Sequence, residues 1–203
     1  MIERKATLMP DARERRIIAR ILKVNHAGEH GAIRIYATQR AISSILNPGI
    51  TAKLDEMYGH EIEHHRLFLE AMPSRSARPC RMLFLWAWGG GVLGILTALC
   101  GKRAVWLCTE AVEHAVHHHL DDQLLYLADK DEELERLIAS IQAEEASHLA
   151  YAKQNSGNPS LLSRLLLRGI GSLTTILIWM STSGDSVRLK RELAANHASH
   201  EGD

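Results

Sequence analysis

The sequence predicts an all-α protein built around a helical bundle. Apolar residues recur with helical spacing along most of the chain, and no segment shows the period-two alternation of a β-strand. Short turn-forming stretches separate these periodic segments at regular places. The 203 residues, 46% of them hydrophobic, are enough for one domain with a well-filled core.

Turn and linker signals divide the chain into six expected helices. The punctuating stretches are NPG (47–49), PSRSARP (73–79), GKR (101–103), DKDEE (129–133) and NSGNPS (155–160). The expected helices cover residues 11–46, 51–72, 82–100, 104–128, 132–154 and 161–180. We expect a flexible segment over residues 1–14, a single domain over 15–182 and a polar tail over 183–203.

The first expected helix contains two glycines on its apolar stripe, Gly28 and Gly31. Each glycine destabilises a helix interior by about 1 kcal/mol relative to alanine. A lone carboxylate, Glu29, stands between them. Together with Ala27, the glycines would make one side of the bundle thin, which would admit either a close neighbouring helix or a flat ligand.

Charge and cysteine content narrow the class of protein. Lysine plus arginine and aspartate plus glutamate both number 24, so no overall charge attracts the chain to nucleic acid. Cys80, Cys100 and Cys108 cannot all pair and form no CxxC motif, which indicates reduced thiols in an intracellular protein. The first fifteen residues contain no apolar run, so we expect no secretory signal or transit peptide.

The chemistry-bearing pattern is Glu…Glu-x-x-His, which occurs twice. Glu29 precedes Glu61 by 32 residues, and Glu113 precedes Glu145 by the same interval. Residues three apart share a helix face, so each Glu-x-x-His pair can chelate one metal ion. One Glu from each of two helices and one Glu-x-x-His from each of two others is the ligand set of di-iron and di-manganese bundles. The expected ligands are Glu29, Glu61, His64, Glu113, Glu145 and His148.

Electrostatics supports this prediction. Four buried carboxylates would repel one another and lose their hydration, whereas two divalent cations would neutralise them. Without metal, we expect the carboxylates to take up protons or the bundle to loosen. Oxygen and nitrogen ligands without cysteine favour iron or manganese over structural zinc.

Neighbouring residues compete for the same roles. Glu144 could pair with His148, Glu61 could pair with His65, and Glu110 lies one turn before Glu113. The repeated interval favours the six residues named above, with the others around the site or on the surface. In the histidine-rich run 114–119, consecutive side chains point in different directions, and His117 is the best placed near the metals and their access route.

Two expected helices, 82–100 and 161–180, are unusually apolar. The first has 19 uncharged positions, about 28 Å of helix, but a single membrane span would put the two halves of the metal site on opposite sides. We therefore expect both helices to face a membrane surface, with an oligomer interface as the alternative. Tryptophans, which favour membrane boundaries, lie in or beside them: Trp86, Trp88, Trp106 and Trp179.

Four stretches resemble the demethoxyubiquinone hydroxylases of late ubiquinone biosynthesis. They are VNHAGEHGAIRIYATQ (24–39), HEIEHHRLF (60–68), LGILTALCGKRAVWLCTEAVE (93–113) and EEASH (144–148). The resemblance extends over roughly residues 15–180. It implies a ferritin-like bundle, a di-iron centre held by the same six ligands, and hydroxylation of a quinone ring with O2. Relatives often carry tyrosine where this chain has Leu120.

The resemblance also implies partners and a location. The substrate would be a polyprenyl benzoquinol, and the external reductant would be NADH. From the small residues themselves, we expect the quinone ring to reach the site through the side of the bundle at Gly28 and Gly31. The protein would be peripheral to the cytoplasmic face of a bacterial inner membrane, or to the matrix face in mitochondria, beside other ubiquinone-biosynthesis proteins. The alternatives are another di-iron oxidase or a ferroxidase, which would need no apolar helices, and a non-catalytic lipid-binding scaffold.

Overall fold

The computed structural model describes residues 11–157 without a break, together with residues 168, 169, 172, 176, 187, 189, 191 and 192. Within the continuous range, the side chain of residue 118 is left out. The expected helix 161–180, with Trp179, and the tail 183–203 lie outside this continuous range.

Five α-helices make up the continuous range, joined by short turns. They are α1 (Ala12–Leu46), α2 (Thr51–Ala71), α3 (Leu83–Leu99), α4 (Lys102–Leu127) and α5 (Glu132–Ser156). Single-turn 3₁₀ helices at Pro48–Ile50 and Pro73–Arg75 occupy the two proline-containing connections. The part of the chain described here has no β-strand, which confirms the all-α prediction.

Helix α1 begins earlier than the expected domain boundary. The Asp11 side chain accepts hydrogen bonds from the backbone N–H groups of Arg13 and Glu14, and the Glu14 side chain accepts one from the Asp11 N–H. This capping box satisfies free N–H groups of the first turn. Residues 12–14, which were expected to be flexible, are therefore helical.

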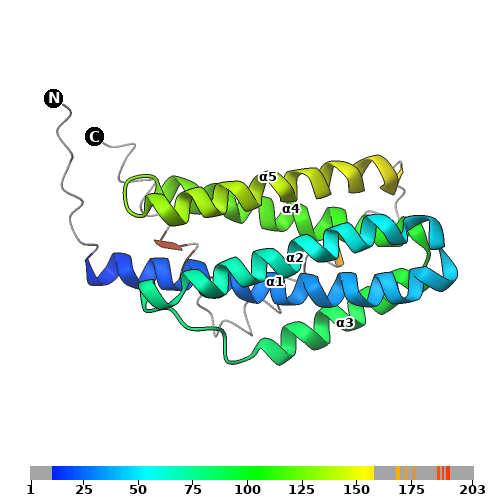
Figure 1. Cartoon of the computed structure of the whole chain (residues 1–203), viewed down its shortest axis with the longest axis horizontal. Helices are drawn as coiled ribbons and strands as arrows, with labels where there is room; N and C mark the ends of the chain where they lie inside the picture. The colour runs from blue at the N-terminus through cyan, green and yellow to red at the C-terminus, as the bar shows by residue number, and fades with distance from the viewer. Residues whose placement is uncertain are drawn as a thin grey trace.

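The helices form two hairpins, α1–α2 and α4–α5, with α3 lying along α1 (Figure 1). Asn25 meets Gln123 and Tyr36 meets Glu113, so α1 and α4 run antiparallel. α3 spans the length between the end of α2 and the start of α4. This long connection lets four helices face one another around a shared interior.

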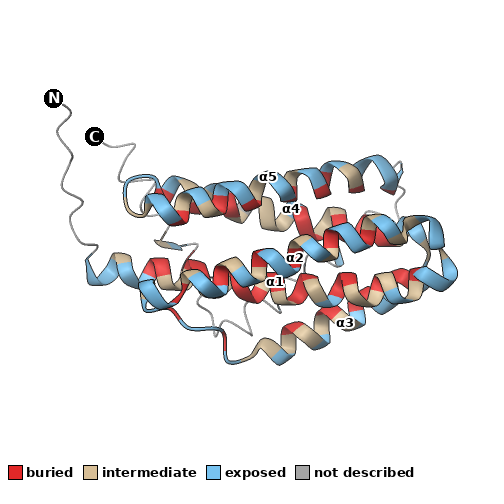
Figure 2. Cartoon of the chain, in the orientation of Figure 1, coloured by how far each residue is buried: buried red, intermediate tan, exposed pale blue. Residues whose placement is uncertain are grey.

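Buried residues line the inward faces of the helices (Figure 2). The two largest apolar clusters among the described residues are formed by different stretches of these helices. The larger contains Ile21, Phe68, Leu127 and Ile138. The other contains Leu54, Met57 and Trp106. On each of the four helices that carry them, the predicted metal ligands lie between these two stretches in sequence, so apolar side chains flank them on both sides.

Glycines allow α3 to approach α1 closely. A Cβ at Gly31 would lie 2.6 Å from Trp86 Cε3, and one at Gly90 would lie 2.4 Å from the Gly31 carbonyl oxygen. A Cβ at Gly94 would meet the Ile35 carbonyl oxygen at 2.5 Å. Contacts this short leave no room for a side chain, so Gly31 serves the approach of a neighbouring helix.

The outward face of α3 is apolar and exposed. Its large exposed side chains are Phe84, Trp88, Val92, Ile95, Leu96 and Leu99, with Trp88 75% exposed. Among the described residues, no helix has the length and apolarity needed to cross a bilayer.

Candidate metal centre

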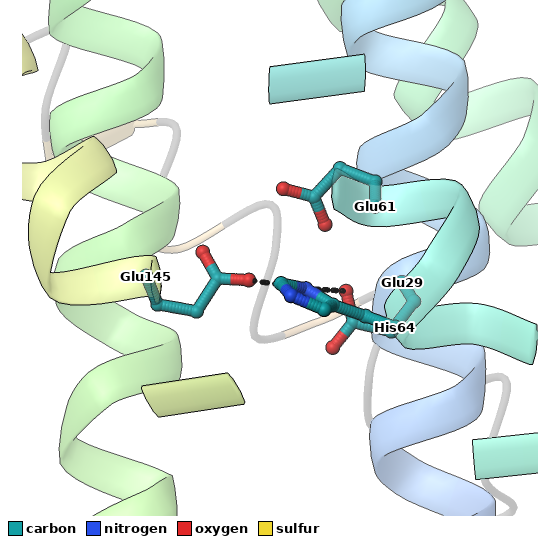
Figure 3. Close-up of side chains that lie close together, drawn as sticks. All are labelled: Glu29, Glu61, His64 and Glu145. Atoms are coloured by element: carbon teal, nitrogen blue, oxygen red, sulfur yellow. Dashed lines mark ion pairs between the residues drawn. The ribbon is translucent and has the colours of Figure 1, made fainter. Parts of the chain in front are cut away.

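All four helices of the bundle contribute to a buried cluster of acids and histidines. Glu29 comes from α1, Glu61 and His64 from α2, Glu113 from α4, and Glu145 and His148 from α5. No residue of the cluster is more than 6% exposed. Figure 3 shows the His64 ring between Glu145 and Glu29, with Glu61 nearby. The structure thus brings together all six residues selected by spacing.

The six residues form two overlapping groups of potential ligands. In each group, one ligand atom per residue lies within 4.8 Å of the others. Position 1 comprises Glu29, Glu61, His64 and Glu145, and position 2 comprises Glu61, Glu113, Glu145 and His148. Because Glu61 and Glu145 belong to both groups, they are placed to bridge two ions.

Both histidines turn Nδ1 toward the carboxylates. His64 Nδ1 lies 2.9 Å from Glu145 Oε1 and 4.0 Å from Glu29 Oε2. His148 Nδ1 lies 3.2 Å from Glu145 Oε2 and 3.6 Å from Glu61 Oε1. Nδ1 is therefore the atom that each imidazole can offer to a metal, which leaves Nε2 to carry a proton.

Glu144 and His60 contact the Nε2 atoms of the two ligand histidines. His64 Nε2 lies 3.2 Å from Glu144 Oε2, and His148 Nε2 lies 3.0 Å from His60 Nδ1. The His60 and His148 rings stack with centroids 5.2 Å apart. Glu144 thus supports the ligand of the opposite helix. Sequence reasoning missed His60, although it precedes Glu61 just as Glu144 precedes Glu145.

Tyr36 is a second residue that sequence reasoning missed. Its hydroxyl donates a 2.6 Å hydrogen bond to Glu113 Oε1 inside the bundle. Burial, followed by the nearby Glu113 charge, raises the pKa of Tyr36 well above its usual value. The phenol therefore stays protonated and acts as a fixed donor to Glu113.

The other competitors lie away from the cluster. The His65 ring packs on the His26 ring, with centroids 4.1 Å apart. The centroid of the His30 ring lies 5.5 Å from that of His65. Glu110 accepts a hydrogen bond from the Ser156 hydroxyl at 2.8 Å. Neither His65 nor Glu110 belongs to a ligand group.

The electrostatics of the cluster suits divalent cations. Burial raises the pKa of Glu29, Glu61 and Glu113 well above the usual range, and the neighbouring carboxylates raise them further. Burial acts in the same direction on Glu145, but hydrogen bonds from His148 and His64 lower its pKa below the usual value. These shifts favour protonated carboxyl groups when no metal is bound, which is the direction expected from the sequence. Two divalent ions would replace the protons and satisfy donor atoms such as Glu61 Oε1, which is buried without a hydrogen bond.

An apolar cavity of about 80 Å³ adjoins the cluster between α1, α3 and α4. It reaches the four glutamates, and its walls include Gly28, Trp86, Leu93, Val116 and Leu120. A Cβ at Gly28 would have no atom within 4 Å, so this glycine borders open space. His119 lines the cavity, whereas His117, the histidine chosen from the sequence, is not among its lining residues.

Four carboxylates and two imidazoles, converging from four helices beside an apolar cavity, define a bundle protein of the metal-dependent oxidoreductase type. The particular family follows from comparison with known sequences. The profile described as "Ubiquinone biosynthesis protein COQ7" matches residues 16–181, and the chain belongs to this family.

Curated relatives extend the match to bacteria and eukaryotes. A human protein named NADPH-dependent 3-demethoxyubiquinone 3-hydroxylase, mitochondrial, is 37% identical over 71% of this chain and 68% of its own. The 3-demethoxyubiquinol 3-hydroxylase of Rhodospirillum rubrum is 33% identical over 81% and 77%. The 5-demethoxyubiquinone hydroxylase of Saccharomyces cerevisiae is 30% identical over 79% and 75%.

Proposed function

We propose that the protein is a 3-demethoxyubiquinol 3-hydroxylase that uses two iron ions and O2 to hydroxylate the ring of a polyprenyl quinol. The observation that supports this most strongly is the buried Glu/His cluster opening onto an apolar cavity. Membership of the COQ7 family gives the substrate class, because its relatives are named as demethoxyubiquinol hydroxylases.

The metal ions would occupy positions 1 and 2, bridged by Glu61 and Glu145. When bound, reduced iron supplies the electrons that activate O2, chemistry that no side chain provides. The protein contributes a fixed ligand geometry and a site flanked by apolar cores, which reduces the access of water.

The cavity suits the head of an apolar ring substrate. Gly28 leaves space on the α1 side, Trp86 forms the α3 wall, and Leu120 forms part of the α4 wall. A quinol ring placed there would lie beside Glu29 and Glu113, next to the metal positions. The isoprenoid tail would leave along α3, whose outer face is apolar.

The exposed face of α3 supports peripheral attachment to a membrane, where the polyprenyl substrate resides. In a bacterium, this would be the cytoplasmic face of the inner membrane. Electrons would come from a reduced nicotinamide. The human relative's name specifies NADPH, whereas the sequence resemblance led us to expect NADH.

The decisive experiment uses iron-loaded protein that is reduced anaerobically and then mixed with ¹⁸O2 and demethoxyubiquinol. We expect a quinol product with one ¹⁸O atom, detected by mass spectrometry. Oxidation of the iron without a modified quinol would instead assign a ferroxidase and contradict the hydroxylase. Binding of the quinol without iron would indicate a lipid-binding scaffold.

Glu113→Ala supplies the matched variant, because it removes one ligand of position 2 and leaves position 1 intact. The iron content should fall from two ions per chain to about one, and turnover should be lost. Two tightly bound irons in this variant would show that the ligand set is wrong.

A further inference from the structure

The metal centre has an internal symmetry that the sequence encodes as an offset of 84 residues. The offset relates Glu29 to Glu113, Glu61 to Glu145 and His64 to His148. Replacing each ligand of position 1 by its counterpart 84 residues away gives the ligands of position 2. Glu61 and Glu145, which belong to both positions, exchange places. Differences between the two positions must therefore come from residues where the repeat is broken.

The first break lies at Tyr36 and its counterpart, Leu120. Tyr36 donates a hydrogen bond to Glu113, whereas Leu120 is an apolar, buried residue of the cavity wall. Glu29 consequently lacks the phenol that holds Glu113. A donated hydrogen bond withdraws electron density from a carboxylate, so Glu113 is the weaker electron donor and the more firmly positioned ligand.

The second break lies at His60 and its counterpart, Glu144. The equivalent contacts are both present, at 3.2 Å from His64 to Glu144 and 3.0 Å from His148 to His60. A carboxylate accepts the imidazole proton more strongly than a second imidazole does, and this makes the ring a more basic ligand. Glu144 Oε2 also lies 3.7 Å from His60 Nδ1, so its charge acts on His64 directly and on His148 only through the His60 ring. His64 is therefore the stronger electron donor of the two.

Both breaks act in the same direction. We propose that the two metal positions are chemically inequivalent: position 1 binds metal more tightly and is the more electron-rich, whereas position 2 is the weaker and more Lewis-acidic. Position 1 also carries Glu29, the carboxylate without a tyrosine partner, next to the cavity at Leu120 and Gly28. This inference rests on the metal centre of the proposed function.

The test is crystallographic and needs no turnover. Metal-free protein is given one Co²⁺ per chain, and anomalous scattering measures the occupancy of each position. We expect position 1 to be occupied several times more than position 2. Equal occupancies, or preference for position 2, would overturn the inference. Protein that takes up no metal at either position would contradict the proposed metal centre itself.

Two variants assign the cause. Glu144→Gln removes the charge behind His64 and should weaken Co²⁺ binding at position 1 by about 10- to 100-fold, as losing such a partner does at other metal sites. His60→Glu copies that charge behind His148 and should raise the occupancy of position 2 toward that of position 1. Both residues are partly exposed, with side-chain accessibilities of 50% and 36%, so the fold tolerates the changes.

Matched controls separate these effects from general ones. Ser140→Glu adds the same charge to an exposed site on α5, and Tyr58→Phe removes a tyrosine hydroxyl outside both ligand groups. Tyr36→Phe should strengthen position 2, whereas Tyr58→Phe should leave the occupancy ratio unchanged. If His60→Glu and Ser140→Glu shift the ratio equally, the contact with His148 is not the cause.

Discussion

Gly28 and Gly31 lie three residues apart on α1 but meet different surroundings. Gly31 is pressed against Trp86 of α3, and Gly28 faces the cavity beside Glu29. Both glycines line the cavity, but only Gly31 also makes the close helix contact, so the two explanations that the sequence left open both apply at Gly31 and only the second applies at Gly28.

This difference gives opposite expectations for the same substitution. Gly28→Ala should stabilise the protein by about 0.5–1 kcal/mol, because alanine favours the helix and nothing obstructs its methyl group. Gly31→Ala should destabilise it by about 1–3 kcal/mol, because the methyl group overlaps the Trp86 ring. Urea unfolding measures both, and a loss of stability in Gly28→Ala would contradict the open space.

A larger residue at position 28 tests whether the quinol substrate enters the cavity. Gly28→Leu should retain two irons per chain and lose quinol hydroxylation, because its side chain fills the space beside Glu29. Iron content by metal analysis and product by mass spectrometry report the two properties separately. Loss of both would mean that Gly28 is needed for packing rather than access.

For single residues, the sequence could not predict a role that depends on contact with another helix. Repeated spacing selected the six clustered residues because metal ligands need a fixed position on a helix face. Helical spacing selected His117, one turn beyond Glu113, whereas the cavity lies on the helix face that carries Val116 and His119, a face set by the position of α3. Tyr36 and His60 contact the ligands across helix interfaces, which a single helix does not reveal.

At the scale of elements, α3 combines a tight inner contact with an apolar outer face. Gly90 and Gly94 bring it against α1, while Phe84 and Trp88 point outward. Its bounds, Leu83–Leu99, agree with the expected 82–100, because a charged residue and a glycine mark its ends. Its place beside α1 was not predictable from an apolar pattern with no polar face.

Helix α3 should carry the attachment to lipid. Trp88→Glu should lower binding to neutral phosphatidylcholine vesicles about 10- to 100-fold, since burial of one large side chain contributes about 2–3 kcal/mol. Vesicle flotation measures the bound fraction. Leu125→Glu, on an equally exposed apolar residue of α4, is the control, and an equal loss there would show that α3 is not the attachment site.

At the scale of the whole molecule, the metal-free protein should become less stable as the pH rises. Burial raises the pKa of Glu29, Glu61 and Glu113, so the folded state holds more protons than the unfolded state above the ordinary glutamate pKa of 4.5. Deprotonation then favours unfolding, by up to about 1.4 kcal/mol per pH unit for each carboxyl group.

The measurement is best made above pH 6.5. Burial lowers the pKa of His26 to about 4 and also lowers those of His30 and His65, so below pH 6.5 their protonation opposes the carboxyl effect. Calorimetry of metal-free protein should give a melting temperature that falls from pH 6.5 to 9, whereas metal-loaded protein should not show this fall. A flat profile for the metal-free protein would contradict the raised carboxyl pKa values.

Most of the helical architecture was predictable because turn residues such as Pro48 and Gly49 interrupt clear periodicity. The start at Ala12 agrees with the expected start at residue 11, although the capping box that forms it lies within a charged stretch that was also expected to be flexible. How the two hairpins face each other depended on the metal pattern, because apolar stripes alone do not specify which helices meet.

The division of the ligands between the two hairpins also affects the rate of unfolding. Each hairpin offers three donors to one ion, and the fourth donor always comes from the other hairpin. Metal can therefore bind fully only after the hairpins have docked, late in folding. Interactions formed late slow unfolding without speeding folding. The metal centre would thus lower the unfolding rate and lengthen the lifetime of the folded protein, with little effect on the folding rate.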